Sequence, residues 1–186
     1  MRRIYRDLLP LWLQKLEATE PMISEEAMMS FAISIAKRNV VEQSGGPFGA
    51  ALFDEDGCLV AVGVNRVLPL QSAFFHAEIV CLFGALERVK SYALPSSHIY
   101  TLASSSQPCA MCMGAIIWAG IRNLLTAAKT TDATEILGFD EGPIHPNWKE
   151  EYQKRGIEVR EDILRAEACD VLKLYVEQGG TVYNPK

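Results

Sequence analysis

Two short segments of this chain carry side chains of the kind that bind transition metals. The first reads His76-Ala77-Glu78, and the second reads Pro108-Cys109-Ala110-Met111-Cys112. Zinc prefers imidazole nitrogen and thiolate sulfur, and a catalytic zinc site uses three such ligands so that its fourth position stays open. His76, Cys109 and Cys112 are three ligands of the right kind. Because the two segments lie far apart in the sequence, any fold of this chain must bring them together.

Glu78 is not needed as a ligand, and its spacing from His76 indicates where both residues stand. In the interior of an α-helix, side chains two residues apart diverge by about 200°. Only in the first turn of a helix can both side chains face one centre. A helix N-terminus also stabilises thiolates through its dipole and its free N–H groups. We therefore expect His76 and Cys109 at the starts of two helices, with Glu78 placed as a general base.

A structural zinc site and a redox dithiol are the alternatives to a catalytic site. An isolated C-x-x-C is compatible with either of them. A redox pair, however, has no need of His76 or Glu78, and a structural zinc site requires a fourth protein ligand. The remaining histidines, His98 and His145, have no supporting motif around them. The pattern therefore favours catalytic zinc.

The composition favours one globular domain in a reducing compartment. A chain of 186 residues, with 49% hydrophobic and 22% charged residues, can bury one substantial core but is short for two independent domains. Its five cysteines include only one close pair, which does not resemble a disulfide framework. We expect a cytoplasmic protein, because thiols stay reduced there.

Neither a membrane nor a nucleic acid is an expected partner. No stretch approaches the roughly 20 apolar residues that span a bilayer, and the apolar run over residues 8–13 is broken by Pro10 and lacks the cleavage site of a signal peptide. The net charge of −5 gives no basic footprint for nucleic acid. This negative net charge favours a small, uncharged substrate over one rich in phosphate. We expect residues 1–24 to form an N-terminal extension that packs onto the domain or onto a partner subunit.

Residues 25–186 are expected to form a single α/β domain. Apolar residues at helical spacing predict helices over 25–43, 76–89, 108–120 and 163–178. Strands are predicted over 49–53, 58–64, 98–102, 123–127 and 157–159, the first two as a hairpin, and residues 104–108 are predicted to form a turn. This order predicts three α/β/α layers, in which helices cover both faces of a mixed sheet of about five strands. Sites in such sheets gather at strand ends and helix N-termini.

With these residues in place, the chain resembles the cytidine-deaminase-like superfamily of zinc deaminases, whose signature is H-x-E followed by P-C-x-x-C. The resemblance covers roughly residues 31–139. Within the superfamily, the chain is most similar to bacterial guanine deaminases. Residues 45–50 resemble their glycine-rich approach to the first strand, and residues 138–141 resemble their second acidic segment. The resemblance implies the three-layer fold of the superfamily, zinc as cofactor and a homodimer, for which the N-terminal apolar segment is a candidate contact.

The resemblance also implies roles for individual residues. Asn65 would hold the purine, and Ala77 would offer its backbone amide to the substrate carbonyl. Glu141 would face the exocyclic amine and help to move a proton onto the leaving ammonia. Phe48 and Trp118 would complete the substrate pocket. From the residues alone, Phe48 can equally be a core residue, Asn65 can shape a turn, and Glu141 can be a solvated carboxylate.

Two departures from the family pattern bear on the pocket. Gln107 stands where family members often have glutamate before Pro-Cys, and residues 72–75 lack the polar side chains commonly found there. The first departure leaves the metal chemistry intact but changes the hydrogen bonding around it. The C-terminal Tyr183-Asn184-Pro185 either closes the pocket, in its own chain or in a partner, or packs on the surface.

The expected activity is hydrolytic deamination of a free purine base, guanine to xanthine and ammonia. The first alternative is deamination of a tRNA adenosine, which the acidic pI near 5.3 disfavours. Cytosine, cytidine and an amino-triazine are further small substrates that the same zinc motif can serve. A zinc-stabilised binding protein without turnover is an alternative of a different class, but such a protein has no need of Glu78.

Overall fold

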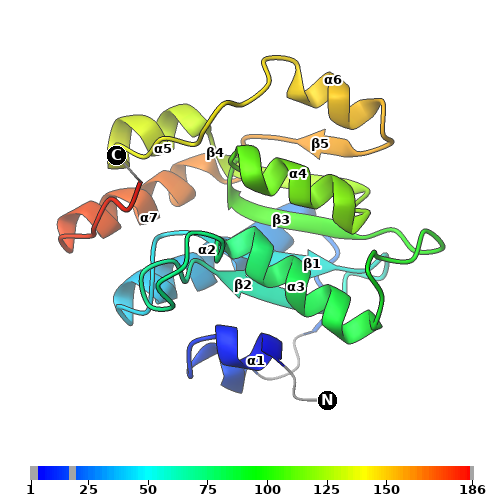
Figure 1. Ribbon diagram of the computed structural model, residues 1–186, viewed down its shortest axis with the longest axis horizontal. Coiled ribbons are helices and arrows are strands. Elements are labelled where there is room, and N and C mark those ends of the chain that lie inside the picture. The colour runs from blue at the N-terminus through cyan, green and yellow to red at the C-terminus, as the bar shows by residue number, and fades with distance from the viewer. Residues whose placement is uncertain (1–3, 17–19, 185–186) are drawn as a thin grey trace.

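The computed structural model describes residues 4–16 and 20–184, and a five-stranded sheet forms its centre (Figure 1). The strands are β1 (Gly49–Phe53), β2 (Leu59–Val64), β3 (Thr101–Ser106), β4 (Asn123–Ala128) and β5 (Glu158–Arg160), in the spatial order β2-β1-β3-β4-β5. Strand β1 runs antiparallel to both β2 and β3, whereas β3, β4 and β5 are parallel. The predicted mixed sheet is therefore confirmed.

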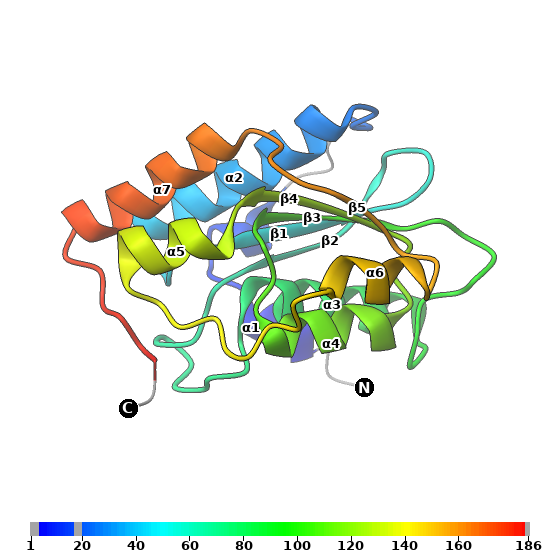
Figure 2. The ribbon, with the colours of Figure 1, turned by 90° about the horizontal axis from the view of Figure 1, so that it is seen from above.

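Helices cover both faces of the sheet and complete three layers (Figure 2). One face carries α2 (Glu25–Val41), α5 (Thr130–Leu137) and α7 (Arg165–Glu177), and the other carries α3 (Ala77–Val89), α4 (Ala110–Ala119), α1 (Ile4–Leu8) and α6 (Trp148–Gln153). Because side chains alternate along a strand, β1 feeds two hydrophobic cores. Ala51 and Phe53 enter the core with α2, while Ala50 and Leu52 enter the core with α3. The predicted α/β/α layering is confirmed.

The N-terminal segment packs onto the domain of its own chain. Leu8, Leu9 and Leu13 are buried in the core that also contains residues of α2, and Leu13 begins a short 3-10 helix, η1 (Leu13–Lys15). The Tyr5 hydroxyl donates to the Val62 carbonyl (2.6 Å) and accepts from the Val62 N–H (3.1 Å). These leucines are thus buried by residues of their own chain and do not face a partner. Parts of the predicted extension, residues 1–3 and 17–19, lie outside the described residues.

Strand β3 begins later and runs further than the sequence pattern predicted. The strand was expected over 98–102, followed by a turn over 104–108, but the ladder with β4 continues from Thr101 to Ser106. Polar serines usually indicate a turn, yet here they are buried and two of them have partners. Ser105 Oγ accepts from the Gly49 N–H (3.0 Å), and Ser104 Oγ donates to Glu78 (2.9 Å). These distant partners make strand pairing of the serines stable.

Helices α5 and α6 were not predicted, because each is too short for its sequence pattern to stand out from a loop. They contain eight and six residues. Helix α5 instead starts with a side-chain cap, in which Asp132 Oδ2 accepts from the Lys129 N–H (2.7 Å). No helix within residues 4–16 and 20–184 is long and apolar enough to cross a bilayer.

Candidate active site

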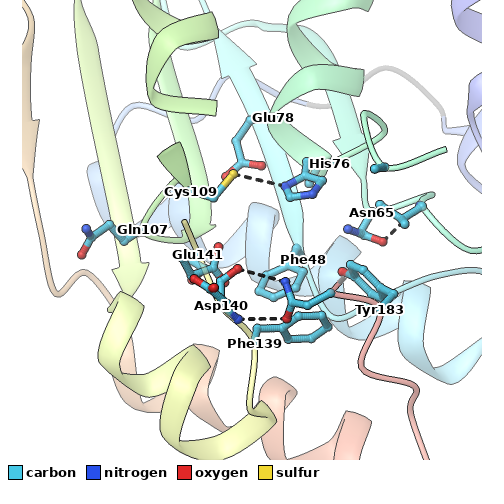
Figure 3. A pocket seen from close by; sticks show the side chains of 15 residues that line it. Phe48, Asn65, His76, Glu78, Gln107, Cys109, Phe139, Asp140, Glu141 and Tyr183 are labelled. Atoms are coloured by element: carbon cyan, nitrogen blue, oxygen red, sulfur yellow. Dashed lines mark hydrogen bonds between the residues drawn. The ribbon is translucent and has the colours of Figure 1, made fainter. Parts of the chain in front are cut away.

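The two motif segments meet because each begins a helix on the same face of the sheet. His76 is the N-cap of α3 and Cys109 is the N-cap of α4, as expected. Cys109 follows the carboxyl end of β3 by a short turn. The ligand atoms of His76, Cys109 and Cys112 all lie within 4.8 Å of one another, and His76 Nδ1 is 3.4 Å from Cys109 Sγ (Figure 3).

This donor set fits zinc. In a tetrahedral site with Zn–N near 2.0 Å and Zn–S near 2.3 Å, neighbouring ligand atoms stand about 3.4–3.8 Å apart. The observed 3.4 Å between His76 and Cys109 matches that separation. Cys109 and Cys112 are buried and His76 is half-buried, so the donors are held by the fold and not by loose surface chain. One nitrogen and two sulfurs leave a fourth position free of protein ligands.

The surroundings of the two thiols change their pKa values in a way that favours metal binding. The Cys109 sulfur contacts both the Cys112 side chain and His76, and these contacts lower the pKa of Cys109 to about 4. The contact with Cys109, together with burial, raises the pKa of Cys112. The site therefore favours one thiolate, and coordination to a cation would remove the proton of the other thiol.

Glu78 lies beside the three ligands and is held there by two contacts. Its Oε1 accepts from Ser104 Oγ (2.9 Å), and its Oε2 accepts from Cys112 Sγ (3.5 Å). The residue is only 6% exposed, and burial raises the pKa of Glu78 above that of an ordinary carboxyl. A carboxylate with a raised pKa is better able to take up a proton and return it. Ser104 was not identified from the sequence, where it was assigned to a turn.

A pocket opens next to the metal ligands and gathers most of the predicted site residues. Its lining includes Phe48, Asn65, His76, Ala77, Glu78, Cys109 and Glu141. Cys112 lies beneath them and is completely buried. Ser106 also lines the pocket; its hydroxyl is buried and has no hydrogen-bond partner among the described residues. Alternation along β3 puts Ser106 on the same side as Ser104, which is the signal that could have identified it.

Three aromatic rings form one wall of the pocket. The Phe48 and Phe139 centroids are 5.8 Å apart, and the Phe139 and Tyr183 centroids are 4.5 Å apart (Figure 3). Phe48 packs against both hydrophobic cores as well, so it serves as a core residue and as pocket lining at once. Flat, apolar rings of this kind suit a flat heteroaromatic ligand.

The C-terminal tail closes one side of the pocket within its own chain. Asn184 pairs with the backbone of Asp140 through two hydrogen bonds, from the Asp140 N–H to Asn184 Oδ1 and from Asn184 Nδ2 to the Asp140 carbonyl, both 2.9 Å long. Tyr183 and Asn184 both line the pocket. Of the arrangements considered for the tail, the structure contains the one in which it covers the pocket in cis.

Glu141 is carried to the pocket by the segment that the tail holds. Its backbone carbonyl accepts from the Ala110 N–H at the start of α4 (3.0 Å), which fixes it beside the metal ligands. Burial, and then the negative charges of Cys109 and Glu78, raise the pKa of Glu141 to about 7. Glu141 is therefore not a solvated acidic residue. Gln107, by contrast, points away from the metal ligands (Figure 3), and its Oε1 accepts from the Thr130 N–H (3.5 Å).

Asn65 is nearly completely buried and has two structural contacts in addition to its place in the pocket. Its N–H donates to the Phe48 carbonyl (3.0 Å), and its Oδ1 accepts from the Val67 N–H (3.3 Å). It therefore also shapes the turn after β2. The Tyr183 hydroxyl reaches the same side chain.

Trp118 does not reach this pocket, so the expectation that it lines the pocket of its own chain is wrong. It is 83% exposed on the outer side of α4. Trp118 stands six residues after Cys112, which in a regular helix places the two side chains about 120° apart around the helix axis. The assignment was made from sequence context and did not consider this helical phase.

Comparison with known proteins agrees with the geometry of the site. The family model described as "Cytidine and deoxycytidylate deaminase zinc-binding region" matches residues 22–128. A guanine deaminase of Bacillus subtilis (strain 168) is 34% identical over 135 residues, which are 73% of this chain and 83% of that protein. A tRNA-specific adenosine deaminase of Haemophilus influenzae is 31% identical over 105 residues, which are 56% of this chain and 58% of that protein.

Comparison with solved structures agrees with the fold. A solved structure of guanine deaminase from Nitrosomonas europaea has a TM-score of 0.85 and 37% identity, and the match covers 90% of this chain and 93% of that one. The matched family region contains the complete H-x-E and P-C-x-x-C segments. This chain therefore belongs to the family of cytidine and deoxycytidylate deaminases, and its chemistry is the zinc-dependent hydrolytic removal of an amino group.

Proposed function

We propose that the substrate is the free base guanine, which the protein converts to xanthine and ammonia. The observation that carries this proposal is the placement of a second carboxylate, Glu141, in the same closed pocket as Glu78 and Asn65. A base that carries both an amino group and a carbonyl needs acceptors and donors on more than one edge, and this pocket offers both. The likeness to guanine deaminases over most of the chain supports it.

The pocket residues can orient the base before any chemistry occurs. The rings of Phe48 and Phe139 offer an apolar surface for its flat faces, and the Asn65 amide can pair with its purine edge. Ala77 is the first residue of α3, where a backbone N–H has no partner within the helix and can donate to the substrate carbonyl. The tail residues Tyr183 and Asn184 exclude water from the side that they cover.

Two carboxylates then divide the proton transfers. Zinc, when bound by His76, Cys109 and Cys112, lowers the pKa of a water ligand to about 7 and so makes it a nucleophile at neutral pH. Glu78 Oε2 takes a proton from the attacking water, while Ser104 holds Oε1, and passes this proton to the ring nitrogen beside the reacting carbon. Glu141 accepts a hydrogen bond from the amino group and guides a proton to it as ammonia leaves. Guanine and water thereby give xanthine and ammonia.

A tRNA adenosine fits this site less well than a free base. The tail covers the pocket in the same chain, on the side where Asp140 and Glu141 stand. The net charge of −5 also disfavours binding of a polyphosphate backbone. A free base needs neither an open side for a nucleotide strand nor phosphate contacts. We further propose that the enzyme works in the cytoplasm, in purine metabolism, where its free cysteines stay reduced.

We also propose that two copies form a homodimer through the outer face of α4. This helix contains no charged residue, and Trp118 on its outer side is 83% exposed. Monomeric proteins rarely leave contiguous apolar helix surface in water. A second copy would bury it.

The experiment is a measurement of ammonia release by the zinc-loaded protein from guanine, cytosine, cytidine, adenine and a tRNA anticodon stem-loop. The control is Glu78→Gln, which keeps the shape of the side chain but cannot take a proton. We expect turnover of guanine and a loss of at least about a hundredfold in the control, with the zinc content unchanged.

Two outcomes would contradict the proposal in different ways. Activity on another member of the set without activity on guanine would keep the zinc chemistry and overturn the substrate. Full activity in Glu78→Gln would remove Glu78 from its assigned role.

A further inference from the structure

Asn39 on α2 is a buried amide whose hydrogen-bonding groups on the side chain are all used. It has no exposed surface. Its Nδ2 donates both protons, one to the Gly46 carbonyl (2.8 Å) and one to the Asn65 carbonyl (3.0 Å), and its Oδ1 accepts from Ser44 Oγ (2.7 Å). Asn39 therefore joins the loop over residues 44–46 directly to Asn65, a residue that lines the pocket.

The backbone of the loop over residues 44–46 packs closely against Asn65. A Cβ on Gly45 would stand 1.9 Å from the Asn65 carbonyl oxygen, and a Cβ on Gly46 would stand 3.0 Å from Asn65 Oδ1. Only glycine fits at such distances. Because the loop backbone packs directly against Asn65, a displacement of the loop toward Asn65 displaces that residue, and the hydrogen bonds of Asn39 link the two when the loop moves away.

The N-terminal segment holds this loop from outside. Trp12 Nε1 donates to Ser44 Oγ (2.9 Å), and the Arg38 guanidinium lies 4.7 Å above the Trp12 ring. Arg66, the neighbour of Asn65, donates from Nε to the Leu8 carbonyl (3.1 Å) and from a terminal nitrogen to the Ser44 carbonyl. The segment thus reaches Asn65 by two routes, through Ser44 and through Arg66.

The direction of every hydrogen bond in the Ser44 route is fixed by chemistry. The indole of Trp12 can only donate, so Ser44 Oγ accepts from it and turns its own proton toward Asn39. Asn39 must then present Oδ1 to Ser44 and Nδ2 to the two carbonyls. A flipped amide would face both carbonyls with an oxygen. The two carbonyls thus fix the orientation of the buried amide, and the indole donor leaves the Ser44 proton turned toward Asn39, so that Ser44 can hold Oδ1 in place.

We propose that Trp12, Ser44 and Asn39 are positioning residues that hold Asn65 in its binding geometry, so that the N-terminal segment sets the affinity of the pocket for the base. The proposal rests on the proposed function, in which Asn65 holds the base. The family match begins at residue 22, so this segment lies outside the region that the family shares. None of the three residues lines the pocket.

The test compares Ser44→Ala and Trp12→Phe with the matched control Tyr5→Phe, each in the full chain loaded with zinc. Trp12→Phe keeps an aromatic ring under Arg38 and removes one donor. Tyr5→Phe also removes the polar tip of an aromatic residue on the N-terminal segment, but its partner is Val62 on β2, away from the Ser44 route. Asn39 itself is left unchanged, because a substitution at so buried a site can prevent folding.

We expect the KM for guanine, and the Kd for the guanine analogue 8-azaguanine measured by calorimetry, to rise about fivefold in Trp12→Phe, the effect of one lost hydrogen bond. The rise should be at least as large in Ser44→Ala, which also loses the contact with Asn39. The kcat and the zinc content should stay the same. Tyr5→Phe should lower the melting temperature without changing either constant. The double variant Trp12→Phe/Ser44→Ala should bind no more weakly than Ser44→Ala alone, because both changes remove the same hydrogen bond.

An unchanged KM and Kd in folded Ser44→Ala would overturn the positioning role, and so would an equal rise in Tyr5→Phe, which would indicate general loosening. The unmodified chain separates this failure from failure of the proposed function. If it releases no ammonia from guanine, the proposed substrate is wrong whatever the variants do.

Discussion

The protonation state of Glu141 should make substrate binding depend on pH. Burial is the largest cause of its pKa near 7, and burial remains when zinc offsets the charge of the thiolates. Below this pKa the side chain is protonated and can no longer accept two hydrogen bonds from an amino group; above it the acceptor is restored. We therefore expect kcat/KM for guanine to rise with pH through about 7, as measured across a pH series.

The variant Glu141→Gln identifies the source of this rise. It has no titrating proton, so its kcat/KM should be lower and should lose the step near the pKa of about 7. A step of the same height in Glu141→Gln would assign the titration to another group.

Ser104 fixes the general base, and its loss should reduce turnover more than binding. Ser104→Ala leaves Glu78 Oε1 without its partner at a buried site, so the carboxylate is no longer held in one orientation. We expect kcat to fall about tenfold, as is typical when a group that orients a catalytic residue is removed, with KM nearly unchanged.

The neighbouring serine provides a matched control for this change. Ser105→Ala removes a hydroxyl that accepts from the Gly49 N–H on the opposite side of the strand. It should reduce stability but not kcat. Equal losses of kcat in the two variants would mean that the strand, and not the contact with Glu78, is responsible.

Site residues differed in how well the sequence could identify them, for a physical reason. The three residues expected to bind zinc could be identified because coordination demands particular atoms at particular spacings, and the structure brings these residues together. Ser104 acts only through Glu78, which is distant in the sequence. The residues that flank Ser104 therefore give no indication of its role. Trp118 failed for the opposite reason, because a local sequence context was used where the phase of the helix decides which way the side chain points.

At the scale of elements, an ion pair joins α5 to α7. Arg165 contacts both oxygens of Asp132, from Nε to Oδ2 (2.8 Å) and from a terminal nitrogen to Oδ1 (2.7 Å), and Asp132 also caps α5. The Arg165 contact lowers the pKa of Asp132 to about 2. We expect Asp132→Asn to reduce the free energy of unfolding at neutral pH by about 1–2 kcal/mol, measured by urea denaturation.

The pH dependence of this contribution has a definite sign. Because the folded pKa of Asp132 lies below its ordinary value of 3.8, the stabilisation is complete above that value and disappears as pH falls toward about 2. The difference between the native chain and Asp132→Asn should therefore shrink in acid. A difference that stays constant at low pH would mean that the cap and packing, not the charge, are what the substitution removes.

Long apolar segments with recognisable start and stop residues were predicted within a few residues, whereas elements held by distant polar partners were not. Helix α2 was expected over 25–43 and ends at Val41. Strand β3 was displaced, because its serines find partners on α3 and β1 that a local pattern cannot reveal. Short helices such as α6, with six residues, gain little from their own periodicity and depend on packing against the domain.

At the scale of the whole molecule, Trp118 tests the proposed dimer. A charge placed at the centre of an apolar interface should separate the two copies, and tryptophans at such positions contribute about 2 kcal/mol or more. We expect Trp118→Glu to be monomeric by sedimentation where the native chain is dimeric. Ile23→Glu is the control, since Ile23 is 88% exposed and precedes α2 on the opposite face of the sheet.

The proposed interface would be disproved by either of two results. The native chain could sediment as a monomer, or Trp118→Glu could retain the mass of a dimer. In the second case another surface would hold the copies together.

The tail has a practical consequence for anyone who prepares this protein. Asn184 is clamped to Asp140 at the edge of the pocket. A purification tag fused close behind Asn184 would thus start beside the pocket. Kinetic constants measured on such a fusion would include an effect of the tag. A cleavable tag fused ahead of α1 leaves the tail unchanged, and comparison of the two fusions would measure how far the tail controls access.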